Sequence, residues 1–380
     1  MSVRLPRTTT GAVPLAVLDL APVSAGSDVP TALRNTVDLA RRAEEWGFSR
    51  YWVAEHHFAA VASSSPAVLI GQIAAATTTI AVGAAAVQLG FTTASAVVES
   101  FGMLEAFYPG RIDLGVGRSG QRRAEARRRA PHDPENQPQW REIDGVVVPA
   151  PFDVSVLMGS ERLRVTTSLL QPGAVVPDFA DQVRDIVAMF DGTFSTAGLP
   201  VHAVPGDRSS LTPWVFGSSA GQSAQVAGRL GLPFVASYHI TPASALDAIS
   251  SYRTAFCPSE RLSSPYVVVS ADVLAADDGA TARRLASSYG HWVYAIRDSG
   301  AAVPYPDPDT VAPLTDQQQA IVADRTATQF VGDAAEVAAR LAALQRVTGA
   351  DELVITSVAH DHQDRLRSHE LIARQWGLTG

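Results

Sequence analysis

The sequence contains no lysine, and all 30 basic residues among its 380 are arginine. Without lysine there is no Schiff-base chemistry, no carbamylated lysine between two metals, and no Walker-type lysine on a nucleotide phosphate. There is a single cysteine, Cys257. One thiol cannot build a disulfide framework, a cysteine zinc site or an iron–sulfur cluster. These absences exclude several classes of enzyme and give no sign of an oxidising compartment.

Positive charge and long apolar runs are also scarce. The net charge is −8, and no basic domain or tail stands out, which argues against nucleic-acid binding. Apolar runs stop well short of the roughly 18 residues that a membrane span requires. The first ten residues carry no apolar segment typical of a signal peptide. We therefore expect a cytoplasmic protein that has neither a nucleic-acid nor a membrane partner.

Apolar runs alternate with helical patterns along the whole chain, as in βα units around a parallel sheet. The pattern predicts strands at residues 14–20, 51–53, 80–87, 111–116, 214–216, 234–237, 266–274 and 352–356. It predicts helices at residues 28–46, 66–77, 94–107, 179–190, 221–230, 243–256, 280–297, 334–347 and 363–376. Eight strands separated by helices favour a (β/α)8 TIM barrel over a doubly wound sheet.

Two segments interrupt this alternation. Residues 121–177, after the fourth strand, are rich in arginine and proline, and residues 299–314, before the last barrel unit, are rich in proline. Both are predicted to be insertions in one barrel domain that spans residues 1–380. In such a barrel the functional residues follow the carboxyl ends of the strands.

Glu55, His56 and His57 form an unusually polar cluster after the second predicted strand. Histidine exchanges a proton near neutral pH, so a histidine at the barrel's functional end is a candidate catalytic group. Because neighbouring residues of a strand point to opposite faces, we expect one of the two histidines to face that end. The alternative is a structural histidine between packed elements.

Residues 217–221, Gly-Ser-Ser-Ala-Gly, lie between a predicted strand and a predicted helix. One interpretation is the nucleophile elbow of a serine hydrolase, with Ser219 as the nucleophile. Asp272 and then His360 or His362 follow in the chain order that this class requires. A simple turn with a serine N-cap fits as well.

Anion binding is a second functional interpretation of the same segment. The hydroxyls of Ser218, Ser219 and Ser223, together with the free N–H groups of a helix N-terminus, could hold a phosphate. Residues 115–120, Gly-Val-Gly-Arg-Ser-Gly, lack the spacing of a dinucleotide fingerprint. Arg118 nevertheless supplies the only kind of strong cation that a lysine-free chain can offer to a phosphate.

Two further patterns allow a functional and a plain interpretation. The arginines that open the first insertion form either a solvated face or a cationic lid over an anionic cofactor, and they are Arg122, Arg123, Arg127, Arg128 and Arg129. His360 and His362 have the spacing of a metal pair but no further ligands beside them. We predict no metal site.

Three segments resemble the bacterial luciferase-like flavin monooxygenases: Trp-Val-Ala-Glu-His-His-Phe at 52–58, Ile-Ala-Val-Gly-Ala-Ala-Ala at 80–86, and Tyr-Pro-Gly-Arg-Ile-Asp-Leu-Gly-Val-Gly-Arg at 108–118. The Ser218-Ser219 helix start, followed by Gly-Leu-Pro at 231–233, is similar to the same family. So is the tail from residues 330–333 to 352–356. This resemblance implies a (β/α)8 barrel that uses reduced FMN and O2 to oxygenate a small molecule.

The resemblance also implies roles for individual residues. His56 corresponds to the family's catalytic histidine, and Ala85-Ala86 corresponds to a non-prolyl cis peptide bond beneath the isoalloxazine ring. The residues implied to bind the FMN phosphate are Arg118, Ser218, Ser219 and Ser223. One dianion would then meet a guanidinium group and a helix N-terminus together.

The sequence departs from luciferase itself in two places. Gly117 stands where luciferase carries a reactive cysteine, and residues 121–177 do not resemble it. We therefore expect a non-luminescent member that acts on a bulkier substrate, such as an aromatic or polyketide-type secondary metabolite. The family also includes deazaflavin-dependent hydride-transfer enzymes, although the two serines are more similar to the FMN members.

Two partners are expected besides the substrate. No NAD(P)H motif is visible, so reduced FMN is predicted to come from a separate flavin reductase. The resemblance also implies a homodimer formed through helices near the second and third strands.

Overall fold

A computed structural model describes residues 5–6, 12–118, 139–153, 161–170 and 176–378. Eight parallel strands form a closed barrel, in which β5 pairs with β10 and β14 pairs with β1. In order around the barrel they are β1 (Leu15–Asp19), β2 (Arg50–Val53), β3 (Ala81–Ala84), β5 (Ile112–Gly117), β10 (Pro213–Gly217), β11 (Phe234–Ala236), β12 (Val267–Ala276) and β14 (Glu352–Thr356). The predicted (β/α)8 barrel is confirmed.

The barrel strands are buried on both faces, which explains why they are almost continuously apolar. Their inward side chains form one cluster, in which Trp52 packs edge-on against Trp214 at 5.7 Å and against Phe216 at 5.4 Å between ring centroids. We call these three residues the aromatic layer. Their outward side chains pack against the surrounding helices in the main core.

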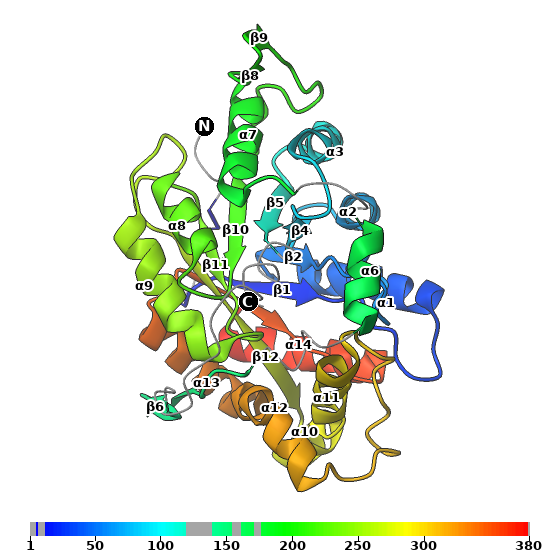
Figure 1. Cartoon of the computed structure of the whole chain (residues 1–380). Helices are drawn as coiled ribbons and strands as arrows, with labels where there is room; N and C mark the ends of the chain where they lie inside the picture. The colour runs from blue at the N-terminus through cyan, green and yellow to red at the C-terminus, as the bar shows by residue number, and fades with distance from the viewer. Residues whose placement is uncertain (1–4, 7–11, 119–138, 154–160, 171–175, 379–380) are drawn as a thin grey trace.

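Helices surround the barrel (Figure 1). They are α1 (Val29–Glu45), α2 (Pro66–Ala76), α3 (Ala94–Phe107), α7 (Phe179–Asp191), α8 (Gln222–Arg229), α9 (Ala245–Ala255), α10 (Gly279–Ala286), α11 (Tyr289–Ser299), α12 (Asp316–Thr328), α13 (Ala334–Thr348) and α14 (His362–Trp376). Their ends follow local chemistry. The Asp28 side chain caps α1, and capping boxes begin α12 at Thr315 and α13 at Asp333.

Several elements differ from the sequence-based prediction. The predicted helix 280–297 is two helices, because the chain turns at Ser287 and Ser288 and brings Tyr289 onto Asp272. The predicted strand 80–87 divides into β3 and β4 (Val87–Gln88) at a cis peptide bond. Helix α12 and the short strand β13 (Phe330–Asp333) were not predicted as elements, because the polar start of α12 gives little apolar periodicity.

Parts of the two predicted insertions contact segments that follow barrel strands. The first includes β6 (Arg141–Ile143), β7 (Val146–Val148) and α6 (Glu161–Leu170). The Val147 carbonyl accepts a hydrogen bond from the Tyr238 hydroxyl at 2.7 Å, and Arg162 donates to the Phe58 carbonyl at 3.2 Å. In the second, Tyr305 forms a β-bridge with Ser24. Both segments therefore lie at the end of the barrel where the strands finish, which we call the mouth.

A small hairpin of β8 (Ser195–Thr196) and β9 (Leu199–Pro200) extends beyond α7, away from the barrel (Figure 1). The turn at Pro205 and Gly206 that follows it lies against Gly102 of α3. Within the described residues, no helix has the length and apolar character needed to cross a membrane.

Candidate functional site

The histidines after β2 lie in different surroundings. The His57 imidazole contacts the Glu55 carboxylate at 2.8 Å and packs edge-on against Phe91. Glu55 also accepts a hydrogen bond from the backbone N–H of Gln88 at 3.1 Å. The His56 side chain is exposed, whereas its backbone N–H is anchored to the Ser63 carbonyl at 2.9 Å. His57 therefore belongs to the wall of the mouth, and His56 is the accessible imidazole.

The end of β3 is joined closely to β5. The peptide bond between Ala85 and Ala86 is cis, as the resemblance implied. Ala85 packs against the inward-facing cluster that contains Trp52 and Trp214, and a Cβ atom placed on Gly117 would lie 3.4 Å from the Ala86 Cβ. Two residues earlier, a Cβ atom on Gly115 would lie 2.0 Å from the Ala84 carbonyl oxygen. Glycine at 115 therefore permits the close approach of the two strands.

Arg118 follows β5 and is 7% exposed. Its Nε donates a hydrogen bond to the Ser223 hydroxyl at 3.0 Å, and its Nη1 donates to the Gln222 side-chain oxygen at 3.2 Å. The Gln222 amide nitrogen in turn donates to Asp178 at 2.8 Å. These contacts fix the guanidinium group at the N-terminus of α8, although Arg118 and Ser223 are 105 residues apart in the chain.

The N-terminus of α8 has the features of an anion site. Its N-cap is Gly221, which provides no capping side chain, so the first turn has N–H groups to offer. A Cβ atom at Gly221 would lie 3.2 Å from Arg118 Nη2 and 3.3 Å from the Ser219 hydroxyl oxygen. The Ser218 carbonyl is held by the Thr241 hydroxyl at 2.9 Å. A cation, a hydroxyl and a helix N-terminus around this glycine fit a phosphate group.

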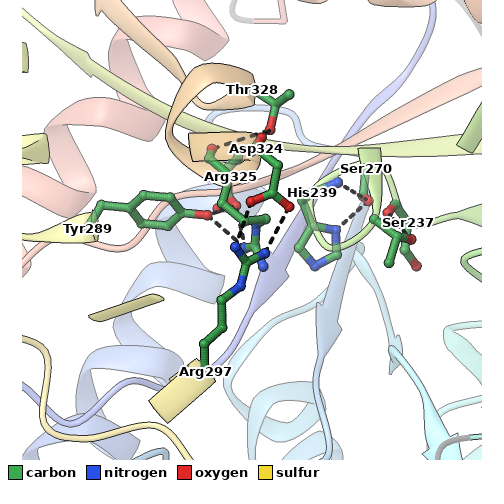
Figure 2. A network of polar contacts seen from close by, with 10 residues as sticks. Ser237, His239, Ser270, Tyr289, Arg297, Asp324, Arg325 and Thr328 are labelled. Carbon is green, nitrogen blue, oxygen red and sulfur yellow. Dashed lines mark hydrogen bonds and ion pairs between the residues drawn. The ribbon is translucent and has the colours of Figure 1, made fainter. Parts of the chain in front are cut away.

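On the other side of the mouth, sequence reasoning missed His239. It follows β11, is 8% exposed, and joins its Nδ1 to the Ser270 hydroxyl of β12 (Figure 2). Burial, together with the positive charges of Arg325 and His56, lowers the pKa of His239 to about 3. No motif surrounds this histidine in the sequence. Its place three residues after a barrel strand was the one available signal.

A buried polar cluster stands next to His239 (Figure 2). The Tyr289 hydroxyl donates to the Asp272 carboxylate at 2.5 Å, and Arg325 Nη2 donates to the same carboxylate at 3.1 Å. Burial raises the pKa of Asp272, and the positive charge of Arg325 opposes this effect. Arg325 Nε is buried and finds no hydrogen-bond partner among the residues that the structure describes. The cluster therefore places a buried carboxylate and a buried guanidinium group in contact beside His239.

The residues of the hydrolase alternative are not assembled around Ser219. Asp272 is bonded to Tyr289 and Arg325, the His360 Nε2 contacts the Ala25 carbonyl at 3.0 Å, and the His362 Nε2 contacts Asp38 at 2.9 Å. His360 and His362 thus face different segments and share no contact as a metal pair. The predicted arginine cluster at residues 122–129 lies outside the described residues.

The mouth of this (β/α)8 barrel brings together a buried arginine at a helix N-terminus, an exposed histidine and an aromatic layer, and these groups could hold a phosphorylated cofactor. Comparison with known proteins specifies the family. Residues 13–352 match the family described as luciferase-like monooxygenase. The chain belongs to this family, and it is therefore an oxidoreductase enzyme.

Several relatives match almost end to end. The chain is 36% identical over 364 residues to the Bacillus subtilis protein YvbT, which covers 95% of this chain and 96% of that protein. It is 34% identical to a luciferase-like monooxygenase of Escherichia coli K12, covering 96% and 97%. The crystal structure of apo-MsnO8 superposes with a TM-score of 0.75 at 29% identity, covering 97% and 98%.

More distant structures share the fold. The oxygenating constituent of 3,6-diketocamphane monooxygenase from Pseudomonas putida, solved in complex with FMN, has a TM-score of 0.60 at 17% identity. It covers 96% of this chain and 97% of that chain. An F420-dependent secondary alcohol dehydrogenase has a TM-score of 0.58 at 14% identity and covers 96% and 99%. The same barrel thus serves flavin and deazaflavin enzymes.

Proposed function

We propose that this protein is a monooxygenase that uses reduced FMN and O2 to oxygenate an organic small molecule. The observation that carries the proposal is the fixed position of Arg118 at the uncapped N-terminus of α8. The proposed phosphate-binding residues are Arg118, Ser218, Ser219 and Ser223. An FMN phosphate is a dianion, which matches one guanidinium group combined with a helix N-terminus. Deazaflavin is the alternative cofactor.

The remaining roles follow from position at the mouth. Ala85 and Ala86 would lie beneath the flavin ring, and the apolar inward-facing cluster against which Ala85 packs would exclude water there. Bound FMN would supply the electrons and the site at which O2 reacts. His56 is the proposed catalytic histidine, because its accessible imidazole can hold or move a proton there.

The proposal extends to the substrate and the partners. Phe58 follows the histidines, is 48% exposed and offers an aromatic surface, which supports an aromatic or polyketide-type substrate. Reduced FMN would come from a separate reductase. Exposed Val68, Met103 and Phe107 on α2 and α3 support a homodimer through these helices. We also propose a single barrel domain and a cytoplasmic location.

The test is an anaerobic titration with reduced FMN, followed by exposure to air. We expect binding of reduced FMN and then a long-lived absorbance change before oxidised FMN appears. Parallel titrations with F420 and with riboflavin serve as controls. Tight binding of F420 without binding of FMN would assign the deazaflavin alternative, and binding of neither cofactor would refute the proposal.

A further inference from the structure

Two histidines stand on opposite sides of the mouth. His56 follows β2 and His239 follows β11, and these strands are four positions apart in a ring of eight. They are therefore diametrically opposed. A positive charge on His56 would lower the pKa of His239, after the larger effects of burial and of Arg325. A planar ring bound between them would have one imidazole on each side.

The hydrogen bonds around His239 favour the tautomer that carries its proton on Nδ1. The Ser270 hydroxyl is 3.3 Å from the Ala236 carbonyl, to which it can donate, and it is bonded to His239 Nδ1. When Ser270 donates to Ala236, it accepts the Nδ1 proton of His239, and Nε2 then carries a free lone pair. Nε2 makes no hydrogen bond within the described residues, and it is not among their fully covered unpaired atoms.

The charges that face His239 keep it in this state. Arg325 and His56 both disfavour a second proton on the imidazole. Asp272 and Tyr289 are committed to Arg325, so they offer His239 no compensating charge. With a pKa of about 3, His239 remains neutral across the range in which an ordinary histidine titrates. It therefore acts as a hydrogen-bond acceptor at Nε2.

We propose that His239 is a further flavin-contacting residue, whose Nε2 accepts a hydrogen bond that the reduced isoalloxazine can donate and the oxidised ring cannot. Reduced flavin carries a proton on a ring nitrogen that is a bare acceptor in oxidised flavin. A fixed acceptor at this position therefore attracts the N–H group of reduced flavin and repels the bare nitrogen of oxidised flavin. This inference rests on the proposed FMN site. On this inference, His239 makes the protein bind reduced FMN more tightly than oxidised FMN.

The test compares two substitutions of His239. Asparagine can still reach Ser270 but has no atom at the Nε2 position, whereas glutamine can place its amide oxygen there. We expect His239→Asn to lower the ratio of oxidised to reduced FMN dissociation constants about tenfold, and His239→Gln to restore most of it. His202→Asn, at an exposed histidine beyond β9, is the matched control and should leave the ratio unchanged.

A second measurement does not depend on the asparagine variant. In wild-type protein labelled with ¹⁵N-histidine, the Nε2 resonance of His239 is assigned by its loss in His239→Gln. Reduced FMN should shift this resonance more than oxidised FMN does. Equal shifts, or an unchanged ratio in His239→Asn, would overturn the inference while FMN binding stands. Failure of wild-type protein to bind reduced FMN would instead refute the proposed function.

Discussion

The two ends of the barrel hold charged and polar residues in opposite ways. At the base, where the strands begin, Arg50 is bonded to Asp113 and contacts Glu352 at 3.3 Å, and it lies 4.5 Å from the centroid of Trp214. Glu352 also accepts a hydrogen bond from Tyr266 at 3.1 Å. These charges are directed at one another.

At the mouth, two polar groups are each fixed by a hydrogen bond to a neighbouring side chain. Arg118 is fixed through Ser223, and His239 is fixed through Ser270, so both side chains are held in place by neutral hydroxyl groups. We infer from this difference that the base serves stability and the mouth serves chemistry, because barrels in general place function at the carboxyl ends of their strands. Removing a charge at the base should affect folding, and removing one at the mouth should affect binding.

The largest expected effect follows loss of the cation at the base. Arg50→Met would leave Asp113 and Glu352 buried without their partner, and burial already raises the pKa of Glu352 against the effect of Arg50. We expect the free energy of unfolding, measured by urea denaturation, to fall by about 3–5 kcal/mol.

The matched control is Arg42→Met, which breaks an exposed ion pair with Glu45 on α1. No measurable change is expected there, because solvent screens such pairs. Equal stability of Arg50→Met and wild type would contradict the view that the base is a structural cluster.

The next largest expected effect is a loss of FMN affinity at the mouth. Arg118→Met removes the proposed phosphate cation, and charge-assisted hydrogen bonds of this kind correspond to a loss of about 10- to 150-fold in affinity. We expect FMN affinity to fall by that factor in a fluorescence titration. Riboflavin, which lacks the phosphate, should bind both proteins equally. An equal loss for riboflavin would show that Arg118 supports the fold of the site and makes no direct phosphate contact.

The contrast between the ends also explains what could be read from the sequence. The barrel strands were predictable because they are short, almost continuously apolar runs, and Arg118 and the serines belong to local motifs. The cis bond at Ala85 was implied by resemblance alone.

Contacts between residues that are far apart in the chain could not be predicted from the sequence. Arg50 and Glu352 are 302 residues apart, and His239 and Ser270 are 31 apart. A charged residue at the start of a strand has the same local pattern whether it faces solvent or a buried partner. The cluster at the base and the role of His239 could therefore be identified only from the three-dimensional structure.

A smaller effect concerns pH, to which the mouth should respond through His239. Its folded pKa is about 3, against about 6.5 in an unfolded chain, so the unfolded state binds more protons between these values. Stability is therefore complete above about pH 6.5 and falls on acidification. Between pH 7 and 5 His239 should account for about 2 kcal/mol of the loss.

Urea denaturation of wild type and His239→Asn at both pH values measures this contribution. The variant should lose less stability than wild type between pH 7 and 5. Parallel losses would mean that His239 is accessible to protons in the folded state, and the mouth would then be no different from ordinary surface.

The smallest effect is expected where β5 passes from the packed interior to the mouth. Gly117→Ala would place its Cβ atom 3.4 Å from the Ala86 Cβ, which is ordinary contact, so we expect a change in unfolding free energy below about 0.5 kcal/mol. Gly115→Ala, on the same face of the strand, would meet the Ala84 carbonyl at 2.0 Å and force β3 and β5 apart. Thermal denaturation of the pair should show one near-native and one clearly destabilised variant. If the two variants were equally stable, the tightly packed part of the barrel would end before Gly115, and the mouth would extend further toward the base.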